Sequence, residues 1–294
     1  MPAHLIAGIA CLLLVPHHIP AVAQTVTDDI GRTVVLPHPA ERIISLAPSI
    51  TESLFAIGAG DRLVGVTDFC TYPPEALKIR RVGGMINPSI EQIVALTPDL
   101  IVLSMEGNQR EDFERLVSLG TPVVVSNPRT LEGIYRSLTM LSTLTGTEVQ
   151  AARLIRSLRD REAAVRKRAD TSRPGVLVIV SVQPLMVVGA PTFLNELIET
   201  AGATNLAADA GGTYPTISRE SVAARDPDIL LFMSEIAQSA ESVTSLYPEW
   251  RYLSAVRRGA VIRVDADLLS RPGPRALDAL EYLVTLFHGP PRDP

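Results

Sequence analysis

The pattern of apolar and polar residues predicts short helices that alternate with short buried strands. Residues 91–103, EQIVALTPDLIVL, first place apolar side chains at helical spacing and then, after Pro98, four apolar residues in a row. A proline ends a helix because it lacks the N–H group that a helix interior needs. A continuous apolar run is typical of a parallel strand that is covered on both faces. This segment therefore predicts a helix, a turn and a strand at 100–103.

The same phrase occurs a second time in the chain. Residues 220–232, ESVAARDPDILLF, repeat Glu, Ala, Pro and Asp at the same offsets. A second pair of related segments lies upstream of the two phrases. Glu52 precedes Gly58 by the same interval that separates Glu196 from Gly202, and each segment is typical of a short helix that ends at a glycine.

An apolar strand is predicted before each of these glycine-terminated helices, at 43–46 and at 176–180. Two segments, 40–130 and 174–265, therefore share one order of elements. Such an order favours an α/β fold made of two similar lobes, each with a mainly parallel sheet. Loops at the carboxyl ends of parallel strands are where α/β folds usually place functional residues.

Residues 147–170 predict one long helix between the two lobes. Ala151, Leu158 and Val165 mark its apolar face, the remaining positions are mostly charged, and Thr147 is the expected N-cap. A helix of this length extends roughly 30 Å or more, so we expect a rigid connection. The predicted layout is a signal peptide at 1–23, an N-terminal lobe (the N-lobe) at 24–146, the helix at 147–170 and a C-terminal lobe (the C-lobe) at 171–294.

Composition narrows the class of protein and its location. The chain has 294 residues, 46% of them hydrophobic, and a net charge of −5. This acidity argues against nucleic acid as a partner, because no basic excess exists to neutralise phosphates. The apolar run LIAGIACLLLV followed by AVAQ predicts a secretory signal cleaved after Ala23, and hence an exported protein. A lipoprotein anchored at Cys11 is the less favoured alternative.

The cysteine and histidine content gives little support to a metal or redox site. After cleavage Cys70 is the only cysteine, so no intramolecular disulfide is possible, and we expect a small buried side chain rather than a reactive thiol. The remaining histidines, His38 and His288, lie near the ends of the mature chain. We therefore expect neither a metal site nor a permanent cofactor.

These features together resemble the periplasmic substrate-binding proteins of helical-backbone type, which serve ABC importers for cobalamin, haem and iron siderophores. The stretches that carry the resemblance are TDFCTYPPEA, RVGGMINPSIEQIVALTPDLIVL, YPTISRESVAARDPDILLF and SRPGPRALDALEYL. The first and the last are most similar to the cobalamin-binding branch. The resemblance implies a monomeric carrier that captures a corrinoid, cobalamin, with haem or a ferric siderophore as the alternative ligand.

The resemblance also implies a set of cleft residues. The candidate ligand-binding residues are Phe69, Tyr72, Met85, Met186, Tyr214, Asp267 and Arg271. Flat apolar groups would pack against a corrin ring, and Arg271 with Asp267 would bind its amide side chains. Arg271 lies in SRPGPR, which contains too much proline and glycine for a helix, so we expect a loop residue that is free to face a ligand.

Other interpretations of these residues remain open. Phe69 and Met85 would also suit the core of a lobe, and Tyr214 would also suit a cap of the turn at Pro215. A haem ligand would take Tyr72 or Tyr214 as an axial ligand. A siderophore would be held by cleft arginines, for which Arg129, Arg271 and Arg275 are available.

Glu91 and Glu220 open the two copies of the repeated phrase. An ABC permease dimer has two-fold symmetry, so a carrier that presents the same feature once per lobe matches it. The resemblance implies that these two glutamates pair with permease arginines. The alternative is that each glutamate only stabilises the first turn of a helix.

An exported hydrolase is the competing class of function, and we do not favour it. The chain contains no GxSxG elbow, no GxGxxG or GxxxxGK phosphate loop, and no well-placed histidine base. No catalytic residue is therefore assigned.

Overall fold

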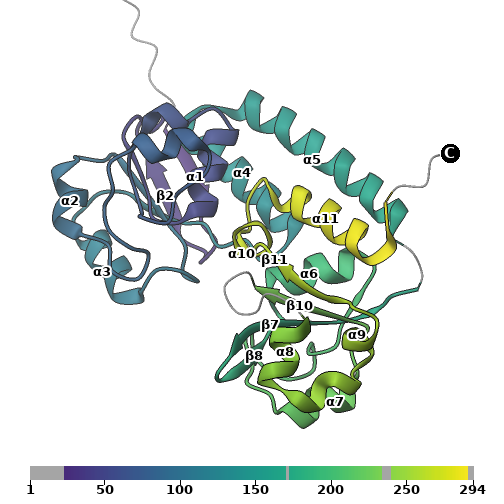
Figure 1. The fold of residues 1–294 in the computed structure, drawn as a ribbon. Helices are drawn as coiled ribbons and strands as arrows, with labels where there is room; N and C mark the ends of the chain where they lie inside the picture. The colour runs from purple at the N-terminus through teal and green to yellow at the C-terminus, as the bar shows by residue number, and fades with distance from the viewer. Residues whose placement is uncertain (1–22, 170–171, 234–239, 291–294) are drawn as a thin grey trace, which may run out of the picture.

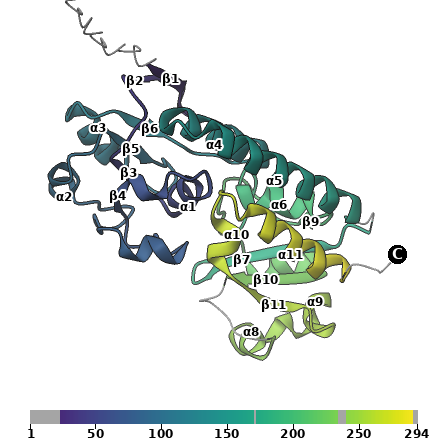
Figure 2. The same ribbon diagram turned by 90° about the horizontal axis from the view of Figure 1, so that it is seen from above.

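The computed structural model describes residues 23–169, 172–233 and 240–290 (Figure 1). The predicted signal peptide therefore lies outside the described residues, apart from Ala23. Two α/β lobes lie side by side, and one long helix, α5 (Glu148–Arg168), runs along both of them (Figures 1 and 2). The expected fold class, with two lobes and a connecting helix, is confirmed.

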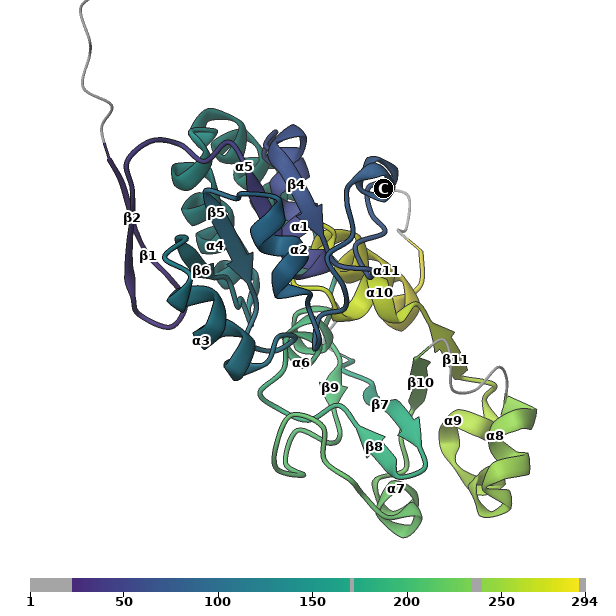
Figure 3. The same ribbon diagram turned by 90° about the vertical axis from the view of Figure 1, so that its left-hand side faces the viewer.

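The N-lobe is built on a four-stranded parallel sheet in the order β4-β3-β5-β6. Its strands are β3 (Ile43–Ser45), β4 (Leu63–Val66), β5 (Leu100–Leu103) and β6 (Val123–Val125). Its helices are α1 (Pro48–Ala56), α2 (Ile90–Ala95), α3 (Arg110–Ser118) and α4 (Leu131–Thr145), with 3-10 turns η1 (Gly60–Arg62) and η2 (Pro74–Lys78). A hairpin of β1 (Gln24–Thr27) and β2 (Thr33–Leu36) lies at the outer edge of this lobe (Figure 3).

The C-lobe is built on a five-stranded sheet with the path β11-β10-β7-β8, and β9 also pairs with β7. All of these pairings are parallel except that of β7 with β8. Its strands are β7 (Gly175–Val182), β8 (Leu185–Val187), β9 (Thr204–Asn205), β10 (Ile229–Met233) and β11 (Val261–Val264). Its helices are α6 (Phe193–Thr200), α7 (Arg219–Arg225), α8 (Ala240–Leu246), α9 (Ser254–Arg257), α10 (Ala266–Ser270) and α11 (Ala276–His288), with the 3-10 turn η3 (Pro248–Tyr252).

The predicted strand at 100–103 is β5, and all four of its side chains are buried. Leu100 and Val102 face one side of the sheet, where they join the apolar cluster beneath α1, α4 and α5. Ile101 and Leu103 face the other side, where they pack with Ile93 of α2. The continuous apolar run thus reflects a strand that is covered on both faces.

One apolar cluster connects the two lobes. It includes Val102 of the N-lobe sheet, Leu158 of α5, Leu280 of α11 and Val178 of the C-lobe sheet. The junction is visible in Figure 3, where α10 and α11 lie between the two lobes. Because close-packed interiors resist deformation, this shared core ties the lobes together.

The outer face of the C-lobe sheet carries a separate apolar cluster. Its largest member is Trp250, which is fully buried with its ring centroid 4.4 Å from that of Tyr247. Phe232 of β10 belongs to the same cluster. This part of the C-lobe core is therefore distinct from the cluster that joins the lobes.

Helix α5 is anchored by its apolar face and by ion pairs. Ala151, Leu158 and Val165 are buried, and Arg161 binds Asp278 and Glu281 of α11 at 2.6 and 2.8 Å. The hydrogen bond from Arg161 holds the pKa of Glu281 below its ordinary value.

The expected N-cap of α5 takes a different form. Thr147 precedes the helix, but its side chain makes no cap hydrogen bond. Its hydroxyl lies 2.9 Å from that of Thr145 instead, because the two threonines are buried together between α4 and α5. The helix ends at Arg168, and Asp170 lies outside the described residues. No helix in the described ranges has the length and apolar character needed to cross a bilayer.

Candidate functional site: a cavity between the lobes

A cavity of about 580 Å³ lies between the two lobes. Val180 belongs to β7 and Met233 ends β10, while Ala266 follows β11. From the N-lobe, Glu106 follows β5 and Arg129 follows β6. The cavity is thus formed at the carboxyl ends of the parallel strands, where α/β proteins usually bind their ligands. Its other lining residues are Thr192, Phe193, Leu194, Thr213, Tyr214 and Ser270.

The charges of the described lining residues cancel. Arg129 Nε lies 2.6 Å from Glu106 Oε1, and both side chains are about half exposed. Tyr214 is 49% exposed. Its pKa is raised, mainly by burial and further by the negative charge of Glu106. A tyrosine hydroxyl is protonated at neutral pH, so the cavity presents a neutral phenol, neutral hydroxyls and one internally paired ion pair.

Of the residues predicted to bind a corrinoid, Tyr214 alone lines this cavity within the described parts of the chain, and Arg129, named for the siderophore alternative, lines it as well. Asp267 lies next to the cavity, because it directly follows the lining residue Ala266. Its side chain is 59% exposed. Met186 lies in β8, where its backbone forms a bridge with Thr216. The roles of Asp267 and Met186 in binding stay predictions.

Phe69 and Met85 lie on neighbouring loops of the N-lobe. Phe69 is 56% exposed, so it is not a core residue. Met85 is partly buried against the shared core, and its Cε approaches Gly107 so closely that a Cβ at that position would collide with it. Gly107 in turn follows the lining residue Glu106. Met85 therefore lies near the cavity without lining it, and the role of Phe69 in binding stays a prediction.

Tyr72 faces a second hollow, of about 470 Å³, at the junction of α1, α5 and α11. The guanidinium carbon of Arg275 lies 4.2 Å from the centroid of the Tyr72 ring. The Tyr72 ring thus makes a cation–π contact with Arg275 and does not line the interlobe cavity.

Arg271 is not free, contrary to the expectation from its local sequence. It is the residue after α10, and its side chain is only 12% exposed. It forms ion pairs with Glu52 at 3.2 Å and with Asp267 at 2.5 Å. No helix covers residues 271–275, as predicted, although α10 extends to Ser270. The prediction missed that Glu52, a buried acid of the other lobe, pairs with Arg271.

Several lining residues were missed from the sequence, in particular Glu106, Thr192, Phe193, Leu194 and Met233. Phe193 and Leu194 begin the amphipathic helix α6 and look like core positions. Their place just after the β7–β8 hairpin, at the carboxyl end of β7, is the signal that could have identified them.

Glu91 and Glu220 occupy equivalent positions, as the repeat predicts. Each is the second residue of its helix, α2 or α7, and each is exposed. Ser89 caps α2 by accepting from Gln92 N at 3.3 Å, and Ser218 caps α7 by accepting from Ser221 N at 3.0 Å. Figure 1 shows α2 and α7 in different lobes, both remote from α5.

The carboxylate of Glu220 is stabilised as an anion by its surroundings. The backbone N–H of Glu220 itself, and then the hydroxyl of Ser218, lower the pKa of this exposed side chain. As an exposed carboxylate it is ionised at neutral pH. Elsewhere in the described part of the chain, no group of three or more His, Cys, Asp and Glu side chains is placed to hold a metal ion.

The fold and the position of the cavity define a two-lobed solute receptor, and the chain belongs to the periplasmic binding protein family, which matches residues 43–268. The vitamin B12-binding protein of Vibrio cholerae is 34% identical over 251 residues, which cover 85% of this chain and 90% of that protein. The crystal structure of the periplasmic vitamin B12 binding protein of Vibrio cholerae aligns with a TM-score of 0.75 at 32% identity, covering 84% of this chain and 96% of that chain.

A haem receptor is similar to a comparable degree. The periplasmic haem-binding protein of Roseiflexus sp. RS-1 in its apo form aligns with a TM-score of 0.76 at 30% identity, and it covers 85% of this chain and 98% of that chain. The predicted membership in a family of substrate-binding proteins is thereby confirmed. Because a vitamin B12 receptor and a haem receptor are similar to this chain to a comparable degree, the chemistry of the cavity lining has to distinguish the two ligands.

Proposed function

We propose that this protein captures a corrinoid, cobalamin, in the interlobe cavity and delivers it to an ABC importer. The observation that carries the proposal is the cancellation of charge in the cavity. Arg129, which a carboxylate ligand would need, is already paired with Glu106 at 2.6 Å. A ligand whose polar groups are neutral amides can hydrogen-bond to the lining hydroxyls and pack on the apolar residues, and it leaves no buried charge unpaired.

The two ligand alternatives fit this lining less well. Haem carries two propionates and siderophores carry anionic oxygens, and both require cations that are free to pair with them. Tyr214 nevertheless offers a phenol that could ligate haem iron, and a haem-binding neighbour shares 30% identity. Haem is therefore the second candidate.

Two further parts of the proposal follow from the family. Residues 1–23 act as the export signal, and the mature protein works in the periplasm as a monomeric, non-enzymatic carrier. Glu91 and Glu220 provide two equivalent, exposed anions, one per lobe, and two permease subunits would each receive one of them.

The ligand assignment is tested by equilibrium dialysis of the purified mature protein against cyanocobalamin, haem and a ferric hydroxamate siderophore, followed by absorbance of the bound compound. We expect saturable binding of one cyanocobalamin per chain. Binding of haem or the siderophore without cyanocobalamin would refute the corrinoid assignment and leave the role as a receptor in place.

A further inference from the structure

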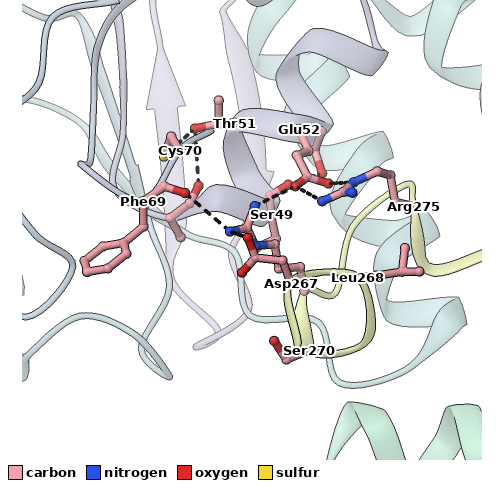
Figure 4. A network of polar contacts seen from close by, with 12 residues as sticks. Ser49, Thr51, Glu52, Phe69, Cys70, Asp267, Leu268, Ser270 and Arg275 are labelled. Atoms are coloured by element: carbon pink, nitrogen blue, oxygen red, sulfur yellow. Dashed lines mark hydrogen bonds and ion pairs between the residues drawn. The ribbon is translucent and has the colours of Figure 1, made fainter. Parts of the chain in front are cut away.

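Glu52 of the N-lobe is buried and holds two arginines of the C-lobe. Its side chain is 2% exposed. Arg275 donates to it through Nε at 2.9 Å and Nη2 at 2.8 Å, and Arg271 Nη1 lies 3.2 Å from Oε1 (Figure 4). The bidentate contact raises the pKa of Arg275. Two cations of one lobe thus meet on a single anion of the other.

The segment between the two arginines lies directly against α1. A Cβ at Gly273 would come within 3.3 Å of the carbonyl oxygen of Ser49. A Cβ at this position would be a tight contact, so either the segment or α1 would have to shift by a few tenths of an ångström. The segment therefore packs closely against α1.

Each arginine also contacts one end of the same N-lobe loop, residues 69–72. Arg271 Nη2 is 3.4 Å from the carbonyl oxygen of Phe69. Arg275 places its guanidinium carbon 4.2 Å from the centroid of the Tyr72 ring, within the range of a cation–π contact. The two ends of the loop are therefore held by the C-lobe.

The middle of this loop is held by the N-lobe. Cys70 is buried, and its sulfur lies 3.1 Å from the Thr51 hydroxyl and 3.2 Å from the Thr67 hydroxyl. Arg81 donates to the Cys70 carbonyl oxygen at 2.9 Å. The Phe69 ring points away from these contacts (Figure 4), and it is 56% exposed.

We propose that Glu52 is a positioning residue for ligand binding: by holding Arg271 and Arg275, it fixes the loop 69–72 and its exposed Phe69 ring relative to the C-lobe side of the cavity. Arg271 directly follows Ser270, which lines the cavity, so the same contact links the cavity wall to the loop. This inference rests on the proposed function in one respect, since it takes the ligand to bind between the lobes.

The test uses Phe69→Trp as a reporter in the full-length mature protein. Trp250 is fully buried, so iodide quenching and the change in anisotropy report on the new side chain. Adding Glu52→Gln should increase iodide quenching and lower the anisotropy of the indole, because a neutral amide holds the two guanidinium groups less firmly. The loop measurement needs no ligand.

The matched control is Glu196→Gln. Glu196 has the same place in the repeat and also makes an interlobe contact, to Leu131 N, but it does not touch the loop. We expect it to leave the indole signal unchanged. In the Phe69 background, Glu52→Gln should weaken cyanocobalamin binding roughly 5–30-fold, and Glu196→Gln should change it less than twofold.

A second variant guards against misfolding. Glu52→Gln leaves two cations near a neutral side chain, and an unpaired buried charge is destabilising. Glu52→Gln combined with Arg275→Gln removes one charge of each sign, and Arg271 keeps Asp267 as its partner. This double variant should fold, and its indole at position 69 should still show more iodide quenching and lower anisotropy than in the Phe69→Trp protein.

An indole that is as ordered in both Glu52 variants as in the Glu196→Gln control would overturn the positioning role. A more mobile indole together with unchanged cyanocobalamin affinity would overturn the positioning role as well. If the parent protein binds no cyanocobalamin, the proposed function fails, and the indole measurement still decides whether Glu52 holds the loop.

Discussion

Glu52 and Glu196 occupy equivalent places in the two halves of the chain, and both accept hydrogen bonds from across the junction of the lobes. Glu52 receives Arg271 and Arg275, and Glu196 receives the backbone N–H of Leu131 at the start of α4. The internal repeat therefore includes a glutamate in each lobe that accepts hydrogen bonds from the other lobe.

Replacing Glu196 should change how stability depends on pH. Burial raises the pKa of this carboxyl above its ordinary value of 4.5, against the opposing effect of the Leu131 N–H. An acid with a higher pKa in the folded chain binds more protons when folded, so its contribution is present below the unfolded pKa and is lost as pH rises through the folded pKa. Glu196→Gln should therefore gain stability relative to the parent protein as the pH rises above 4.5, where the carboxyl of the unfolded parent ionises.

Urea unfolding at several pH values measures this difference directly. Glutamine keeps an acceptor for the Leu131 N–H, so the hydrogen bond itself survives the substitution. A difference between variant and parent that stays flat, or that falls with rising pH, would show that burial does not control this carboxyl.

Removing the exposed glutamates of the repeat should reduce transport and leave the protein otherwise intact. Because Glu91 and Glu220 are exposed, Glu91→Ala and Glu220→Ala should each change the free energy of unfolding by less than about 0.5 kcal/mol. Ligand affinity should be unchanged. Uptake should fall, more so in the double variant, and reversal to lysine should reduce it further.

Glu111→Ala is the matched control for these variants. Glu111 is also exposed and is also the second residue of a helix, α3, but it lies outside the repeated phrase. If uptake by the double variant equals that of the Glu111 control at equal protein levels, the glutamates serve only the first turns of their helices.

The elements of the repeated phrase were predictable because they depend on local pattern. Strand β5 and the start of β10 fall at the residues that the apolar runs indicate, and serine caps precede both helices. The partners of Arg271 were not predictable, since Glu52 lies 219 positions away and only folding brings them together. The lining residue Phe193 was missed for a related reason: a helix start looks the same whether it faces a core or a cavity.

Replacing Tyr214 should separate the two candidate ligands. Tyr214→Ala should cost about 1–3 kcal/mol of binding free energy for a corrinoid, which loses an aromatic contact. Tyr214→Phe should bind cyanocobalamin nearly as well as the parent, because the ring remains. If the phenol instead ligates haem iron, Tyr214→Phe should bind haem less well, and the absorbance spectrum of the bound haem should change. Tyr252→Ala, which removes a 69% exposed tyrosine of η3, is the control.

The angle between the lobes should hardly change on ligand binding. Helix α5 is continuous over its 21 residues, and a single apolar cluster extends from one sheet to the other. Closure by hinge bending would require this cluster to separate. Small-angle scattering of the free and ligand-saturated protein should give the same radius of gyration within error, and a marked compaction would contradict a rigid connection.

Trp250 is an intrinsic fluorescent probe of the C-lobe. It is the only tryptophan of the chain, and it lies in the outer C-lobe cluster, apart from the core that joins the lobes. Its emission during denaturation follows the C-lobe, whereas far-ultraviolet circular dichroism follows helices of both lobes. Coincident transitions would mean that the shared core makes the molecule one cooperative unit, and separated transitions would mean that each lobe unfolds by itself.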